Sequence, residues 1–156
     1  MTHRRADNLL AAGLGCAGLV CVVVGTFLPW LYSGSRTRNS YATSGAVRRL
    51  LGVDGVGAAA LAAWPFVGVA CGAAIAALLV GLRRIAALIG LVAAATAATG
   101  AVAMLRAGDN GVFRPANVGP IVTLVGSLIV PAAVMIHMFL YLDLTGDDGD
   151  QPVATG

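Results

Sequence analysis

The sequence contains no lysine and no glutamate, so all 10 basic side chains are arginines and all 7 acidic side chains are aspartates. Charged residues make up only 11% of the chain, whereas a soluble domain carries about 25%. Apolar residues reach 58%, against about 45–50% in soluble domains, and the mean hydropathy is +0.87. This balance excludes a disordered chain and a basic nucleic-acid-binding domain, and it opposes almost any water-soluble globule.

Side chains that usually carry chemistry are also scarce. The three cysteines, Cys16, Cys21 and Cys71, stand apart in apolar stretches, so we expect small buried hydrophobes and no redox pair. Two histidines far apart in the sequence are too few for a zinc site. No phosphate-binding loop, nucleophile elbow or His-Glu-x-x-His motif occurs. The sequence therefore predicts no enzymatic activity, no cofactor and no metal.

Four apolar stretches are long enough to cross a bilayer, because about 20 residues rising about 1.5 Å each span a hydrocarbon core of about 30 Å. Charged residues fall outside these stretches, as the cost of a charge in lipid requires. Lipid offers the backbone no hydrogen bonds, and the stretches lack strand-like alternation, so we expect helices. The predicted spans are residues 9–28, 62–82, 85–105 and 121–142.

The predicted fold class is an all-α membrane protein, with four antiparallel transmembrane helices in one bundle over residues 1–145. Residues 146–156 contain glycine, aspartate and no apolar run, which predicts a disordered acidic tail. Both termini then lie on one side of the membrane. Arginines beside the first span and in the short turn at residues 83–84 favour the cytoplasm for that side, whereas the total arginine count of the loops opposes it.

Small residues at four-residue spacing indicate where neighbouring helices approach closely. They recur once in each span, which predicts a tightly packed bundle. The four stripes are Gly13, Ala17, Cys21 and Gly25; Gly68, Gly72 and Ala76; Ala86, Gly90, Ala94 and Ala98; and Gly119, Thr123, Ser127 and Pro131.

Few polar side chains lie within the spans. Thr96 and Thr99, one helical turn apart, are candidates for a polar patch inside the bundle, although such threonines usually bond to their own helix carbonyls. His137, near the end of the fourth span, could bind a ligand or a proton, and the simpler interpretation is a packed or interfacial histidine. These three residues form the candidate intramembrane polar site.

The first loop, over residues 27–52, combines aromatic and basic side chains. Trp30 and Tyr32 suit a membrane interface. Beyond Ser44, apolar side chains share one helical face and arginines the other, which predicts a short interfacial helix near lipid phosphates. An ordinary aromatic-anchored loop is the alternative to a partner- or lipid-binding surface. The candidate binding residues are Trp30, Tyr32, Arg36, Arg38, Tyr41, Arg48 and Arg49.

This loop also carries a resemblance. Its pattern is Pro29-Trp30, Ser33-Gly34, Arg38-Asn39-Ser40-Tyr41, Gly45 and Arg49-Leu50. The pattern resembles the first loop of small, mostly uncharacterised four-span membrane proteins of high-GC bacteria. The resemblance implies the bacterial cell membrane and an outward-facing first loop, and it implies no activity.

Abundant helix-packing surface without intramembrane chemistry favours a non-enzymatic accessory or scaffold subunit of a cell-envelope or transport complex. The alternative is a small carrier or channel for a neutral or lipidic solute. The expected partners are membrane lipids and either another membrane protein or further copies of this chain, and no nucleic acid.

Overall fold

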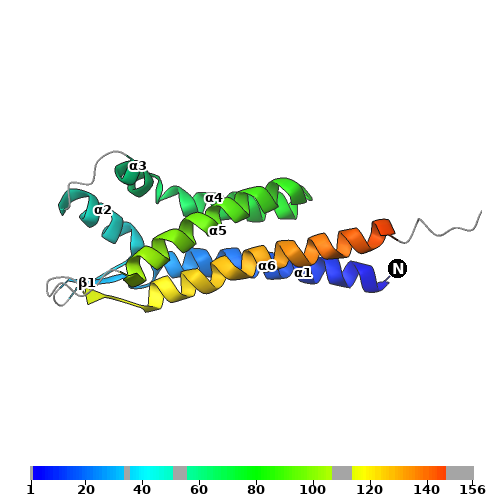
Figure 1. The fold of residues 1–156 in the computed structure, drawn as a ribbon, viewed down its shortest axis with the longest axis horizontal. Coiled ribbons are helices and arrows are strands. Elements are labelled where there is room, and N and C mark those ends of the chain that lie inside the picture. Colours follow the sequence, from blue (N-terminus) through cyan, green and yellow to red (C-terminus); the bar gives the residue numbers. More distant parts are fainter. Residues whose placement is uncertain (1, 34–35, 51–55, 107–113, 147–156) are drawn as a thin grey trace, which may run out of the picture.

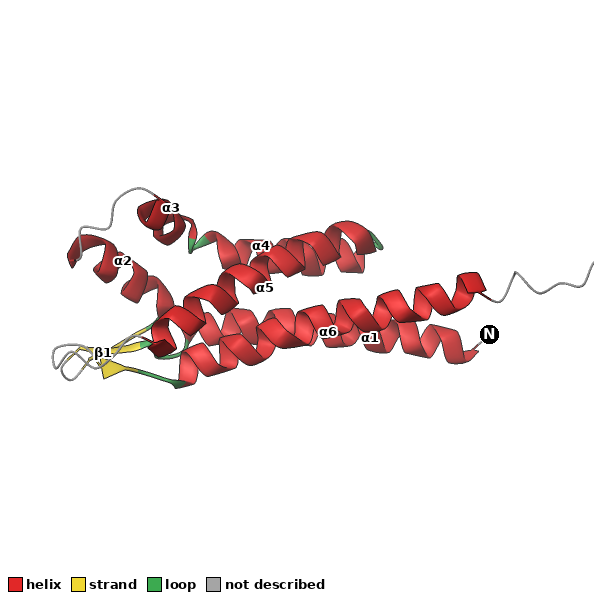
Figure 2. Ribbon diagram, viewed as in Figure 1, coloured by secondary structure: helices red, strands yellow, loops and turns green. Residues whose placement is uncertain are grey.

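The computed structural model describes residues 2–33, 36–50, 56–106 and 114–146, which are mostly helical (Figures 1 and 2). The predicted tail lies outside the described residues beyond Gly146. In chain order the elements are α1 (Thr2–Phe27), β1 (Leu31–Ser33), β2 (Arg36–Arg38), α2 (Ser40–Leu50), α3 (Val56–Ala63), α4 (Phe66–Leu79), α5 (Arg83–Arg106), β3 (Arg114–Pro115) and α6 (Val118–Gly146).

Among the described residues, three helices are long and apolar enough to cross a membrane. Their apolar segments coincide closely with the predicted first, third and fourth spans. They are Leu9–Phe27 in α1, Arg83–Arg106 in α5 and Val118–Phe139 in α6.

A fourth span over residues 62–82 is not confirmed, because this apolar stretch is divided between two helices. α3 ends at Ala63, and Pro65, which has no N–H to donate, precedes α4. α4 has 14 residues. At about 1.5 Å per residue it extends about 21 Å, which is less than a hydrocarbon core of about 30 Å. A charge-free run does not by itself reveal such a break.

The helices form two antiparallel pairs. α1 packs along α6, and α4 and α5 form a hairpin that packs against them (Figure 1). We call one end of the bundle the terminal end, because it contains the start of α1, the end of α6 and the α4–α5 turn (Figure 1). The strands lie at the opposite end, which we call the sheet end. At the turn, Gly81 has φ +83 and donates its N–H to the Leu78 carbonyl, while Leu82 donates to Ala77. These bonds satisfy the last α4 carbonyls.

A three-stranded sheet in the order β2-β1-β3 lies at the sheet end. It joins the first loop, which contains β1 and β2, to the connection between α5 and α6, which contains β3. β1 is antiparallel to both neighbours, with Leu31 opposite Arg38 in β2 and Pro115 in β3. The chain is mostly helical, as predicted, and this small sheet is a feature that the sequence analysis did not predict. Strands of two or three residues are too short to show an alternating pattern in the sequence.

Small side chains are buried and large apolar side chains are exposed, which is the reverse of the arrangement in a water-soluble protein. Alanine supplies more than half of the buried apolar residues that the structure describes, and Ala74, Ala97 and Ala101 are fully buried. Large side chains point outward, so that Leu79 is 79% exposed and Leu88 67%. Small residues let helices approach closely where apolar burial gives no driving force, as in lipid.

The α1–α6 pair is in closest contact at glycines. A Cβ atom added at Gly126 would lie 2.7 Å from the Gly18 carbonyl oxygen, and one at Gly25 would lie 2.7 Å from the Thr123 nitrogen. Real Cβ atoms do not come so close, so the two backbones are in direct contact. Gly13, from the same predicted stripe as Gly25, is exposed with nothing within 4 Å of such an atom, so that part of the stripe is wrong.

Candidate functional site

The first loop closes the C-terminal end of α1 with two buried side chains. Trp30 donates its indole N–H to the Gly25 carbonyl oxygen at 2.8 Å, and Ser40 donates its hydroxyl to the Thr26 carbonyl oxygen at 2.7 Å. These carbonyls belong to the last turn of α1 and have no partner within the helix. Trp30 is only 3% exposed, because its ring folds back onto the helix end. The Trp30 side chain is therefore buried and does not belong to the exposed surface of the loop.

Two tryptophans fill the sheet end of the bundle. The rings of Trp30 and Trp64 meet edge to face, with centroids 5.5 Å apart and an interplanar angle of 72°. Trp30 lies against Gly119 of α6, and Trp64 lies against Gly100 of α5, where any Cβ atom would overlap the ring. The pair therefore holds α5 and α6 in place beside the first loop.

Tyr41 joins α2 to α1. Its hydroxyl lies 3.1 Å from Thr26 Oγ1, and its ring centroid lies 5.3 Å from that of Phe27. Thr26 Oγ1 donates to the Val23 carbonyl oxygen at 2.6 Å, which makes the Tyr41 hydroxyl the donor in their contact. Half-buried and bonded in this way, Tyr41 has a structural role and is not part of a free binding surface.

The predicted first-loop helix exists as α2, and it begins earlier than expected. Its N-cap is Asn39, whose Oδ1 accepts the Ala42 N–H at 2.9 Å, whereas Ser44 donates within the helix to the Tyr41 carbonyl oxygen. Arg48 and Arg49 lie in the last turns of α2, and their side chains lie outside the described part of the structure.

Part of the predicted loop site is exposed on one side of the sheet. Tyr32 pairs with Thr37 of β2 and Arg114 of β3, and directly paired residues project from the same face. All three are exposed, so Tyr32, Thr37 and Arg114 form a row that we call the sheet row. Arg36 is also exposed, whereas Arg38 is half-buried. The Arg38 carbonyl oxygen accepts the backbone N–H of Trp30 at 2.8 Å.

The candidate intramembrane polar site is not formed. Thr96 and Thr99 are exposed on the outer surface of α5, and their hydroxyls donate to Val92 and Ala95 carbonyl oxygens of their own helix, each at 2.8 Å. They do not line the pocket that contains His137. The self-bonded arrangement is the usual one for helical threonines.

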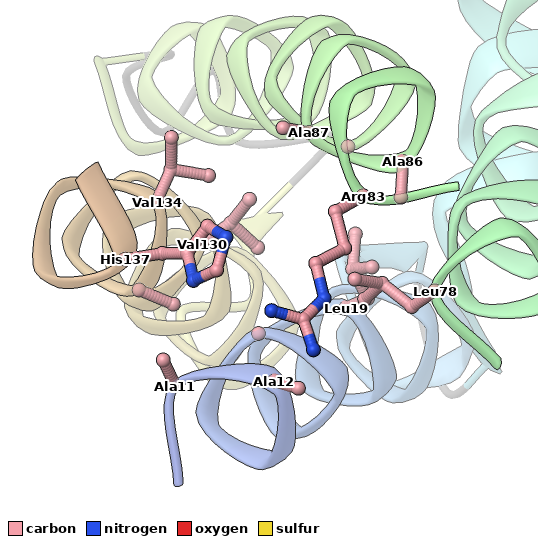
Figure 3. A pocket seen from close by; sticks show the side chains of 13 residues that line it. Ala11, Ala12, Leu19, Leu78, Arg83, Ala86, Ala87, Val130, Val134 and His137 are labelled. Atoms are coloured by element: carbon pink, nitrogen blue, oxygen red, sulfur yellow. The ribbon is translucent and has the colours of Figure 1, made fainter. Parts of the chain in front are cut away.

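His137 lines a pocket of about 70 Å³ at the terminal end (Figure 3). Residues from α1, α4, α5 and α6 line this pocket. Most of the lining is alanine, glycine, leucine and valine. Arg83 from α5 and His137 from α6 both point into it (Figure 3). Sequence reasoning singled out His137 and missed Arg83, because residues so far apart in the sequence meet only through the antiparallel path of α5 and α6.

Within the described ranges, no three histidine, cysteine or acidic side chains come together. Cys71 is fully buried in α4, and Cys16 and Cys21 are half-buried in α1; all three are free thiols.

Comparison with models of protein families, with curated proteins and with solved structures finds no match for this chain. The residues and their geometry are therefore the basis for a functional proposal.

Proposed function

We propose that this chain is a multi-pass protein of the bacterial cell membrane and serves, without catalysing a reaction, as an accessory or scaffold subunit of a cell-envelope or transport complex. The main support is the reversed distribution of side-chain size, with alanine inside and leucine, valine and phenylalanine outside. A continuous apolar exterior is unfavourable in water and suits lipid or partner helices. The first-loop resemblance likewise implies a protein of the bacterial cell membrane.

The buried polar side chains that have hydrogen-bond partners at the end of α1 support a scaffold over a catalyst. Trp30, Ser40 and Thr26 hold the end of α1 and its contact with α2. Side chains committed to such bonds are unavailable to a substrate. These bonds also keep the loop surface in a fixed position, which a docking subunit requires.

The alternative proposal, a carrier or channel, is less well supported. Sites for small molecules usually enclose about 300–1,000 Å³, whereas the pocket beside His137 measures about 70 Å³. Thr96 and Thr99, which would have lined a solute path, face outward.

We further propose that both termini are cytoplasmic and that the partner contacts the sheet row on the outer side. Tyrosine and arginine are enriched at the energetic centres of protein interfaces. Tyr32 and Arg114 both belong to this row, where the bonds of the sheet hold their backbone in place.

Affinity purification of the tagged full chain in mild detergent tests this proposal. We expect a stoichiometric partner with the wild type, and loss of most of it with Tyr32→Ser combined with Arg114→Ser, since each interface centre contributes about 2 kcal/mol or more. The matched control at the terminal end combines two exposed positions, Leu82→Ser and Arg84→Ser, and should retain the partner. Recovery of the 15.6 kDa chain alone would contradict the scaffold. Equal retention by both double variants would contradict the role of the sheet row.

A further inference from the structure

The terminal-end pocket combines an apolar interior with two nitrogen-bearing side chains, and the scaffold function does not use it (Figure 3). We propose that this pocket binds one acidic phospholipid, whose phosphate contacts Arg83 and His137 and whose acyl chain enters the space between the two helix pairs. This inference rests on the proposal that the helices lie in a bilayer.

The charge of the pocket favours an anion. None of the 13 described residues that line the pocket is acidic, and Arg83 contributes a permanent positive charge. A guanidinium group has five N–H donors and fits phosphate oxygens in a bidentate way. Arg83 also takes part in another interaction, so a bound phosphate would not be its sole partner. His137 adds a ring N–H from the opposite helix.

The position of these two residues along the helices matches the level of lipid phosphates. Arg83 is the first residue of α5, and His137 lies six residues before Asp143, the first charged residue after the apolar part of α6. Arg83 therefore lies where α5 would leave the hydrocarbon core, and His137 lies within the last two turns of the apolar part of α6. Basic pockets between helices at this level are suited to anionic headgroups.

The size of the pocket favours part of a chain over a whole solute. An engineered cavity of about 150 Å³ holds one benzene molecule, and this pocket has about half that volume. It can accept a few methylene groups of an acyl chain that continues outward between the helix pairs. Leu19, Leu78 and Val130 supply the apolar surface for such a chain.

Native mass spectrometry of the delipidated full chain in detergent tests the headgroup contact. The probes are dioleoyl phosphatidylglycerol, dioleoyl phosphatidylcholine and inorganic phosphate. We expect one phosphatidylglycerol per chain, bound about tenfold more tightly than phosphatidylcholine, and loss of that preference in Arg83→Ala. Arg84→Ala is the matched control, because Arg84 is exposed like Arg83 but does not line the pocket. Arg83→Gln, which keeps most of the side-chain length, serves if Arg83→Ala fails to fold.

A second variant tests the acyl-chain contact without touching either polar group. Cβ atoms added at Gly15 and Gly90 would meet their nearest neighbours at 3.7 Å, an ordinary contact distance, so Gly15→Ala with Gly90→Ala should fold. Because both positions line the pocket, the added methyl groups should weaken both lipids several-fold. The same pair at Gly13 and Gly72, where nothing lies within 4 Å, should leave lipid binding unchanged.

Three results would overturn the inference. They are equal affinity for the two lipids, equal loss in Arg83→Ala and Arg84→Ala, and displacement of phosphatidylglycerol by equimolar inorganic phosphate, which would indicate a site for a free anion. The partner-capture experiment is independent of these outcomes. A chain that retains its partner and shows no lipid preference would refute this inference alone.

Discussion

Leucine in place of Gly126 is expected to force α1 away from α6 and to lower the melting temperature of the detergent-solubilised protein by about 6–12 °C. The new Cβ atom would meet the Gly18 carbonyl oxygen, the Val22 nitrogen and the Cys21 Cβ, all within 2.9 Å. Two of these are backbone atoms of α1, which cannot rotate away. Overpacking costs up to about 3 kcal/mol, and about 2–4 °C is lost per kcal/mol in a chain of this size.

Gly13→Leu and Gly72→Leu are the matched controls for this prediction. Both glycines lie in helices and both have open space where a Cβ atom would be added. Leucine is a better helix former than glycine by about 1 kcal/mol, so these variants should melt at the wild-type temperature or above it. Circular dichroism measures the melting temperatures. An equal decrease of the melting temperature in Gly126→Leu and Gly13→Leu would mean that the α1–α6 contact is not the one described.

Alanine in place of Trp30 is expected to lower the free energy of unfolding by about 3–5 kcal/mol, the usual effect of removing a buried aromatic side chain. The substitution removes the ring that covers Gly119 and the indole donor to the Gly25 carbonyl oxygen. It also removes the edge-to-face contact with Trp64. Thermal unfolding in detergent measures the loss, and Tyr32→Ala, at an exposed position in the neighbouring strand, should have little effect.

Phenylalanine substitutions separate the hydrogen bond from the packing of the two rings. Trp30→Phe loses the bond to the Gly25 carbonyl oxygen and should cost about 1 kcal/mol more than Trp64→Phe. The difference is expected because the buried Trp64 indole N–H has no partner in the part of the chain that the structure describes. Equal losses in the two variants would argue against the role of Trp30 as a cap of α1.

The spacing of small residues predicts the buried faces of α5 and α6, and it fails for α4 and for the first half of α1. Ala86, Gly90 and Ala94 of α5 are buried as predicted. On α4 the predicted Gly72 is exposed, and the buried residues are Val67, Cys71, Ala74 and Ala77. Helices this rich in alanine and glycine carry small residues on several faces. The position of the neighbouring helix decides which face is buried, and local spacing does not contain that information.

The contacts of the site residues also depend on the folded arrangement, which the local sequence does not contain. A tryptophan just after an apolar helix is typical of a membrane interface, so the local pattern places Trp30 on the surface. Its hydrogen bond to Gly25 and its contact with Trp64 exist only once the loop has folded back. The meeting of Arg83 and His137 likewise depends on the antiparallel order of α5 and α6. What the sequence does reveal is the positions of the long apolar helices and the helical character of α2.

Extraction of cell membranes with alkaline carbonate, followed by ultracentrifugation, tests most directly whether the apolar exterior of α1, α5 and α6 faces lipid. The proposal predicts that the intact chain stays in the membrane pellet and is released only by detergent. Recovery of the chain in the supernatant as a monodisperse species without detergent would contradict it.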